Sequence, residues 1–339
     1  MKKILILIIL IPLISLSQQQ SLETINYDDN EREYIIYVPQ SYSIDIPTPL
    51  LLAFHGGSGY ADDFMNNEAD FRSIADTSGF ILIYPQALED PNDNNSTNWL
   101  HKEPTDHKDV FFIEALIEEI TAQYNIDIER IYACGYSLGG MFSYELACQL
   151  NHKVAAISSV SGAIFQGAFQ YCEIFHPTAV QSINGTEDDI HPYDDQNGWG
   201  YFSVAAIESF WSTSNNTDST PVFTQVPDIN ILDGSHVERY TWINGDGCVS
   251  VEELKIIGGG HDWPSPLSSW ANQDINATAE VWNFVSKFNM EGLIGCNSLG
   301  VSNYDNTNFK LPLKAFDLFG KAIKNQKNQL FFQIYDDGS

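Results

Sequence analysis

One ten-residue stretch constrains the fold more than any other part of the chain. "YACGYSLGGM" at 132–141 joins an apolar, strand-like run to a helix-like segment, and Gly135 and Gly139 stand two residues to either side of Ser137. Glycines at this spacing let a strand and a helix pack closely around a strained turn that points the serine outward. The pattern predicts that Ser137 is an exposed nucleophile. The alternative is a glycine-rich turn with a structural role alone.

The segments on either side of this turn alternate between strand-like and helix-like patterns. Continuous apolar runs, typical of strands buried on both faces of a parallel sheet, occur at 34–38, 49–54, 79–85, 130–134, 155–162 and 178–185. Helical spacing of apolar residues occurs at 61–79, 109–125, 141–150, 203–211 and 279–288. This alternation predicts an α/β fold with a doubly wound, mostly parallel sheet flanked by helices.

The N-terminal residues have the pattern of an export signal. Residues 1–17 begin with two lysines, continue with a short apolar run and end on small residues, as secretory signal peptides do. The run is too short for a permanent membrane span, and no later segment reaches about 18 apolar residues. We therefore expect a secreted protein, extracellular or at the cell surface, with a main domain at 18–296.

The composition changes after Cys296. Residues 297–308 are rich in Asn and Ser, and 309–339 contain a lysine-rich segment with strand-like runs. We expect 297–339 to be a linker followed by a small β element. "DLFGK" at 317–321 resembles a strand-turn pattern of the C-terminal sorting domains in bacteria with type IX secretion. That resemblance implies secretion machinery as a partner of the tail.

The charge balance bears on the partners of the protein. The chain has 45 Asp and Glu against 16 Lys and Arg, a formal net charge of −29. A field of this sign repels phosphate backbones and anionic membrane surfaces, so we expect no nucleic-acid or membrane partner. We also expect no metal and no cofactor, because "DPNDNN" at 90–95 lacks the glycine and terminal glutamate of a calcium loop and no nucleotide-binding loop opens a helix.

Five cysteines are present, so at least one is unpaired. Cys134 lies in the apolar run before Ser137, where a small buried thiol is usual, and we expect a structural role for it. Export permits disulfides among the other four, but their pairing does not follow from the sequence.

Serine-based acyl transfer needs a base, an orienting acid and N–H donors for the developing oxyanion. His55-Gly56-Gly57 follows a strand and offers a flexible backbone. We expect the Leu138 amide to be one donor and the Gly57 amide the other, with Gly56 as the alternative. His55 is expected to brace this loop.

The base and the acid should follow the nucleophile along the chain. His261, in "GGGHDW" after a strand-like run, is the expected base, and His236 is its competitor. Asp188, just past the run 178–185, is the expected acid, with Asp189 next. We expect the remaining histidines downstream, His152, His176 and His191, to be surface or loop residues.

Taken together, these segments resemble the secreted α/β-hydrolases grouped as polyhydroxybutyrate depolymerase-like and feruloyl esterase-like carbohydrate esterases. The resemblance runs from Tyr34 to Phe288 and rests on motifs in the family's order. They are "LLLAFHGG", "NWL", "DVFFIEALI", "NIDIERIYACGYSLGGM", "NGTEDDIHPY" and "GGGHDWPS". Asn184, His191 and Ser265 depart from the family pattern, which leaves the substrate preference open.

The resemblance implies that Ser137 is the nucleophile, Asp188 the acid and His261 the base. Trp99 and Trp263 are either aromatic walls of a substrate pocket or core residues, and we add Tyr136 to the substrate-binding set.

The expected function is that of a secreted serine carboxylic-ester hydrolase releasing feruloyl or acetyl groups from polysaccharide. The first alternative is a polyhydroxybutyrate (polyester) depolymerase. A non-catalytic glycan-binding protein and a peptidase of the same fold are further alternatives.

Overall fold

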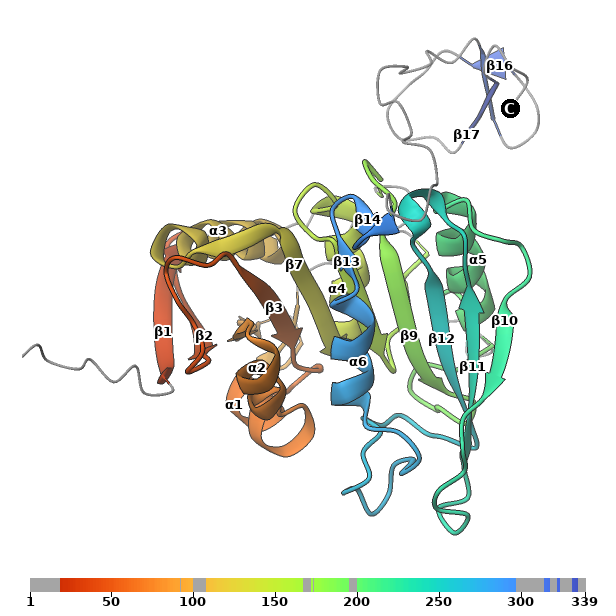
Figure 1. Ribbon diagram of the computed structural model, residues 1–339, viewed down its shortest axis with the longest axis horizontal. Coiled ribbons are helices and arrows are strands. Elements are labelled where there is room, and N and C mark those ends of the chain that lie inside the picture. Colours follow the sequence, from red (N-terminus) through yellow and green to blue (C-terminus); the bar gives the residue numbers. More distant parts are fainter. Residues whose placement is uncertain are drawn as a thin grey trace, which may run out of the picture.

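A ten-stranded sheet forms the centre of the protein (Figure 1). The computed structural model describes residues 19–91, 93–99, 108–166, 172, 174–194 and 200–296, and three short strands in the tail. In spatial order the strands are β1 (Gln19–Tyr27), β2 (Asn30–Val38), β4 (Ile81–Pro85), β3 (Thr48–Phe54), β7 (Ile126–Tyr136), β8 (Ala156–Val160), β9 (Ala179–Gly185), β12 (Val251–Ile257), β11 (His236–Trp242) and β10 (Val222–Gln225).

The six central strands, from β4 to β12, are parallel, and antiparallel strands extend the sheet at both edges. The expected strands are present, and β3, β4, β8 and β9 are buried along their whole length. The run 34–38, expected within the parallel part of the sheet, lies in β2, which pairs antiparallel with β1 and β4. The edge strands β1, β10 and β11 were not expected. β10 is fully exposed, so its sequence carries no burial pattern.

Helices cover both faces of the sheet, as expected. One apolar layer lies under α3 (Lys108–Gln123), α4 (Leu138–Gln149) and α5 (Val204–Ser214). The other lies under α1 (Ala61–Asp63), α2 (Arg72–Ser78) and α6 (Ala277–Val285), which stand in front of the sheet in Figure 1. The two layers with the sheet between them give an α/β three-layer architecture.

The helix expected over 61–79 is broken into three pieces. A π-helical turn, Phe64–Glu68, follows α1, and Ala69 leaves helical geometry before α2 begins. Phe64 and Met65 are buried, whereas Glu68, the last residue of the turn, is exposed at the carboxyl edge of the sheet. Single π turns inside helices often lie at functional sites, because they re-aim side chains.

Two short antiparallel strand pairs lie outside the main sheet. β5 (Glu89–Asp90) pairs with β6 (Ser96–Thr97), and β13 (Phe288–Asn289) pairs with β14 (Gly292–Leu293) next to the 3-10 turn Asp246–Cys248. In the tail, β15 (Lys314–Asp317), β16 (Ala322–Ile323) and β17 (Phe331–Ile334) form a separate three-stranded sheet. The expected signal peptide and the linker 297–308 lie outside the described residues. The domain boundaries remain predictions.

Two disulfides staple the main domain, one joining Cys148 to Cys172 and the other joining Cys248 to Cys296. Cys134 is a free, buried thiol whose pKa is raised by burial, which confirms its expected structural place.

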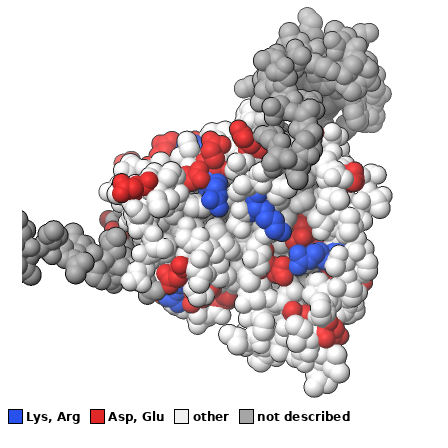
Figure 2. All heavy atoms as spheres, viewed as in Figure 1, with Lys and Arg blue, Asp and Glu red and all other residues white. Residues whose placement is uncertain are grey.

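Acidic side chains outnumber basic ones on the face drawn in Figure 2. In the part of the chain that the structure describes, no helix is both long and apolar enough to cross a membrane.

Candidate active site

Three side chains from three loops meet at the carboxyl edge of the sheet. Ser137 directly follows β7, Asp188 follows β9 and His261 follows β12. The Ser137 Oγ lies 2.8 Å from His261 Nε2, and His261 Nδ1 lies 2.7 Å from Asp188 Oδ2. Because the carboxylate can only accept, Nδ1 carries the proton and Nε2 is left to accept the proton of the serine hydroxyl. This is the geometry of a Ser–His–Asp triad.

The turn at Ser137 is strained. Its φ of 53° and ψ of −118° are rare for a residue with a Cβ. The turn closes only because its neighbours are glycines: a Cβ on Gly135 would lie 2.3 Å from the carbonyl carbon of Gly139, and one on Gly139 would lie 2.2 Å from Phe54 O. The Ser137 amide is held by Val160 O at 2.8 Å, so the hydroxyl projects from a fixed backbone.

The acid is held by its own loop. The Oδ1 atom of Asp188 accepts the backbone N–H groups of Ile190 at 2.9 Å and His191 at 2.7 Å. These two donors leave Oδ2 directed at His261, and the Asp188 side chain is almost completely buried. Asp189, the alternative acid, is exposed. The structure thus brings Asp188, and not its neighbour, to the imidazole.

The loops of the acid and the base are joined by hydrogen bonds. Glu187 N donates to Gly259 O at 2.8 Å, and Gly258 N donates to Thr186 Oγ1 at 2.9 Å. A Cβ on Gly185 would lie only 2.3 Å from Gly259 O. The glycine run before His261 therefore permits this close approach, which sets the distance between acid and base.

The expected oxyanion loop lies against the start of α4. A Cβ on Gly57 would be 3.5 Å from Leu138 Cδ2, and one on Gly56 would be 3.3 Å from Ser137 Cβ. Leu138 is the first residue of α4, where a backbone N–H has no partner within the helix and the helix dipole favours negative charge. The roles of the Leu138, Gly57 and Gly56 amides remain predictions, and this placement is compatible with them.

His55 braces that loop, as the sequence suggested. Its Nε2 accepts from Ala87 N at 3.1 Å, and its Nδ1 donates to Gly56 O at 2.7 Å. Burial lowers the pKa of His55 to about 4, so the imidazole is neutral. The loop is also tied through Ser58 N, which donates to Thr97 O at 2.8 Å.

Of the expected substrate-binding residues, Trp99 needs a correction. Its side chain is 1% exposed, stacks on Phe142 at 5.0 Å and donates its N–H to His55 O at 2.9 Å. An indole buried in this way packs under the His55–Gly57 loop through its bond to His55 O and does not line a pocket. The interpretation as a core residue is the one that the structure supports.

Tyr136 and Trp263 lie beside the base. The Tyr136 hydroxyl donates to His261 O at 2.7 Å, which ties the base loop to the nucleophile turn. Trp263 packs edge-on against Tyr136 and donates to Thr278 Oγ1 at 3.1 Å. Both line a cavity next to the triad, although Trp263 is mostly buried.

Sequence reasoning missed two residues that contact the base and its loop, and His191, expected to be a surface or loop residue, is a loop residue but buried. The His191 ring stands perpendicular to the His261 ring at 5.0 Å, and its Nδ1 lies 2.7 Å from Ser161 O. The Ser161 hydroxyl in turn donates to Asp262 O at 2.9 Å. Ser161 follows the strand β8 and so shares the carboxyl edge, which is the signal that could have singled it out. His236, the competing base, begins β11 opposite Ile257.

In the described part of the chain, no group of three or more His, Cys, Asp or Glu side chains is arranged to hold a metal ion.

Known proteins share both the sequence pattern and the fold. The family model "Esterase PHB depolymerase" matches residues 32–176. A bifunctional acetylxylan esterase/xylanase from Neocallimastix patriciarum is 26% identical over 277 residues, 82% of this chain and 36% of the relative. A probable feruloyl esterase C from Aspergillus oryzae is 30% identical over 239 residues, 69% of this chain and 77% of the relative.

The first two curated relatives are longer than the matched region. The chain spans 36% of the first and 58% of the second, a probable feruloyl esterase C from Aspergillus flavus. Among solved structures, an acetyl xylan esterase from Aspergillus awamori superposes with a TM-score of 0.53 at 18% identity, covering 71% of this chain and 94% of that one. This likeness shows the α/β-hydrolase fold. With the fold, the family model and the Aspergillus oryzae relative in agreement, the chain belongs to the family of polyhydroxybutyrate depolymerase-like and feruloyl esterase-like carbohydrate esterases.

Proposed function

We propose that the protein is a serine carboxylic-ester hydrolase that releases feruloyl or acetyl groups from polysaccharide. The observation that carries the proposal is the unbroken chain of hydrogen bonds from Ser137 through His261 to Asp188. The relatives named as feruloyl and acetylxylan esterases support this choice of acyl group and polymer.

The reaction follows from the geometry in two stages. In the first, Ser137 Oγ attacks the ester carbonyl carbon as its proton passes to His261 Nε2, and the carbonyl oxygen becomes an oxyanion facing the Leu138 and Gly57 amides. The tetrahedral intermediate collapses when His261 returns that proton to the leaving alcohol oxygen, and the acyl group stays on Ser137. The buried carboxylate of Asp188 stabilises the imidazolium that forms between these steps.

In the second stage, water takes the place of the alcohol. His261 removes a proton from the water, the resulting hydroxide attacks the acyl carbon, and a second oxyanion forms at the same amides. When this intermediate collapses, the carboxylic acid leaves and His261 returns the proton to Ser137 Oγ. One ester and one water thus give one alcohol and one acid, with the protein unchanged.

The test is hydrolysis of p-nitrophenyl acetate, methyl ferulate and a hydroxybutyrate oligomer by the purified chain. Ser137→Ala should lower the rate by about 10³-fold or more. Ser73→Ala, on the exposed side of α2, is the matched control and should retain the wild-type rate. Equal rates for the wild type and Ser137→Ala, or no hydrolysis by folded wild-type protein, would remove the proposal and favour a glycan-binding protein.

A polyester substrate is the second candidate, and one surface feature favours it. Ile229, Ile231 and Leu232 are 74%, 77% and 88% exposed on one loop near the carboxyl edge of the sheet. Exposed apolar patches mark sites of interaction, here with an apolar, insoluble polymer. Release of hydroxybutyrate from a film at a rate above that of feruloyl or acetyl release would select this candidate.

We also propose that the protein is secreted. The pattern at 1–17 supports this, as do the two disulfides, which form and persist in oxidising compartments. Secretion machinery acting on the tail stays a prediction, and mass spectrometry of protein collected from the culture medium would show whether both ends are removed.

A further inference from the structure

A cavity of about 350 Å³ opens beside the base of the triad. Tyr136, which precedes the nucleophile, and Asp262, which follows the base, form the wall nearest the triad. Glu68, from the end of the π-helical turn, and Trp270, from the loop between β12 and α6, also line it. The volume is within the range of small-molecule sites.

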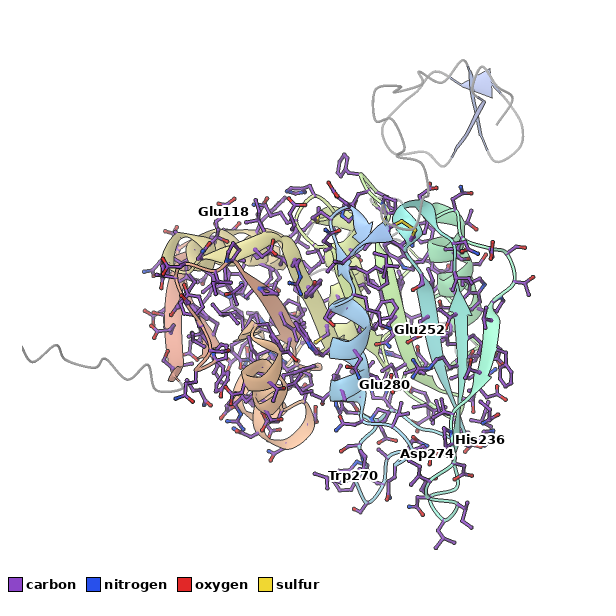
Figure 3. The ribbon with its side chains drawn as sticks, viewed as in Figure 1. Glu118, His236, Glu252, Trp270, Asp274 and Glu280 are labelled. Carbon is purple, nitrogen blue, oxygen red and sulfur yellow. A yellow bond between two sulfur atoms is a disulfide. The ribbon has the colours of Figure 1, made fainter. Side chains whose placement is uncertain are left out.

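The rim of the cavity presents an aromatic ring to solvent. Trp270 is 81% exposed, and Figure 3 shows its side chain at the edge of the loop that precedes α6. The loop is closed by the bond from Ser265 N to Asn272 O at 3.0 Å, and Ser268 Oγ accepts the amides of Trp270 at 3.2 Å and Ala271 at 2.9 Å. An exposed indole on such a well-bonded loop is pre-organised for a flat, partly apolar ligand.

The same loop is anchored to its neighbour. Asp274, also labelled in Figure 3, accepts the amides of Ile229 at 2.7 Å and Asn230 at 3.2 Å through Oδ1. Asn272 Nδ2 donates to Ser235 Oγ at 2.8 Å. These contacts hold the position of Trp270 relative to the sheet, so a ring stacked on it is held at a set distance from the triad.

The remaining lining is polar and acidic. Acceptors come from Glu68 and Asp262, and amides from Asn66 and Asn67. Asp70, the third carboxylate, is paired with Arg72 at 2.8 Å. Partial desolvation and the nearby Asp63 raise the pKa of Glu68 to about 7, so near neutral pH this exposed side chain can accept or donate a hydrogen bond.

The ligand that fits this lining has many hydroxyls and no negative charge. Hydroxyl groups donate to carboxylates and amide oxygens, while one face of a sugar ring offers C–H groups to an indole. Of the described residues that line the cavity, none is a Lys or Arg. A uronic acid would therefore bring its carboxylate toward Glu68 and Asp262, while Arg72, bonded to the lining residues Asn66 and Asp70, is already paired with the Asp70 carboxylate.

The position of the cavity assigns it to the alcohol side of the ester. The leaving oxygen must come within reach of His261 Nε2, which returns the proton to it. Asp262 follows His261 in the chain and the Tyr136 hydroxyl donates to the His261 carbonyl oxygen, so the cavity borders the residue that serves the leaving oxygen. An acyl chain or aromatic acid would leave the polar lining without hydrogen-bond partners.

We propose that this cavity binds the sugar unit that carries the ester, with Trp270 stacked on its ring and Glu68 and Asp262 accepting its hydroxyls, and that it selects neutral over uronic-acid saccharides. This inference rests on the proposed function for the position of the ester. The binding of the saccharide itself can be measured without turnover.

The test measures the binding of acetylated xylo-oligosaccharide and acetylated oligogalacturonide to the Ser137→Ala full chain by calorimetry. Adding Trp270→Ala should weaken binding of the neutral oligosaccharide about tenfold, and Trp270→Tyr should restore part of it. The matched control is Phe223→Ala, since Phe223 is 51% exposed on the distant strand β10 and should leave the dissociation constant unchanged. Glu68→Gln should reduce the difference in dissociation constant between the neutral and the acidic oligosaccharide, and about 0.5 M salt should reduce it too.

Equal affinity for the two saccharides, or a dissociation constant that Trp270→Ala does not change, would overturn the inference. In the active enzyme, the ratio of kcat/KM for the acetylated xylo-oligosaccharide to that for p-nitrophenyl acetate should fall about tenfold with Trp270→Ala. If the wild type hydrolyses no ester but the Trp270-dependent binding is found, the proposed function fails and the saccharide site stands.

Discussion

Replacing Gly185 by alanine tests how closely the acid and base loops must fit. The added Cβ would lie 2.3 Å from Gly259 O and 2.4 Å from Gly260 O, and both obstacles are main-chain atoms. An ordinary contact begins at 3.4 Å. The two loops must therefore move apart by about 1 Å, because neither carbonyl can rotate away as a flexible side chain would.

The displacement acts on the bond between His261 Nδ1 and Asp188 Oδ2. That bond is 2.7 Å long, and an opening of about 1 Å takes it beyond hydrogen-bond range. Misplacement by 1 Å costs about 10²-fold in rate, and loss of the orienting acid costs about 10⁴-fold. We expect kcat for methyl ferulate to fall between these limits in Gly185→Ala.

Steady-state kinetics with a thermal unfolding curve is the assay. Gly234→Ala is the matched control, because Gly234 has a φ of 80° and a Cβ there would meet nothing within 4 Å. Gly234→Ala adds the strain of left-handed backbone but no clash, so it should lower the melting temperature while leaving kcat at the wild-type value. A folded Gly185→Ala protein with kcat within about threefold of the wild type would refute the reasoning.

Three further results are expected. Burial and the neighbouring Glu253 raise the pKa of Glu208, so the folded protein holds a proton that the unfolded chain releases. The free energy of unfolding, measured by urea titration, should therefore fall as pH rises above about 4.5, and Glu208→Gln should make this fall smaller. An equal fall in the wild type and the variant would contradict the prediction. Arg32→Ala removes the 2.7 Å ion-pair partner of the buried Asp109 carboxylate and should cost about 3 kcal/mol in unfolding free energy, against less than about 1 kcal/mol for Arg72→Ala at a partly exposed pair. Replacing both cysteines of the Cys248–Cys296 bridge, which are 48 residues apart, should cost about 4 kcal/mol, and an unchanged denaturation midpoint would argue against a stabilising role.

The triad could be predicted because each member stands at a strand end with a local signature. Ser137 sits between its glycines, Asp188 follows a buried run and His261 follows a glycine run, so the chain itself marks them. The carboxyl ends of parallel strands meet at one edge, which brings the three together. The central strands and most helices were equally readable from their apolar patterns.

The rest depended on contacts between segments distant in the chain. His191 gained its place from the ring of His261 and the carbonyl of Ser161, and neither contact has a local signal. The sequence around Trp99 is compatible with a pocket wall and with a core position, and only the burial of its side chain in the folded chain distinguishes the two. The exposed strand β10 lacks an apolar pattern because it buries little, and the disulfide pairing is a property of the folded chain.

The Cys248–Cys296 bridge has a mechanical consequence. A pull on the tail enters the domain at Cys296 and passes through the sulfur atoms to Cys248, which directly precedes the region of β12. The covalent path of this force bypasses the backbone between these cysteines, which contains β12, His261 and α6. A tail held by another body could thus be under tension while the base of the triad stays in register with its serine.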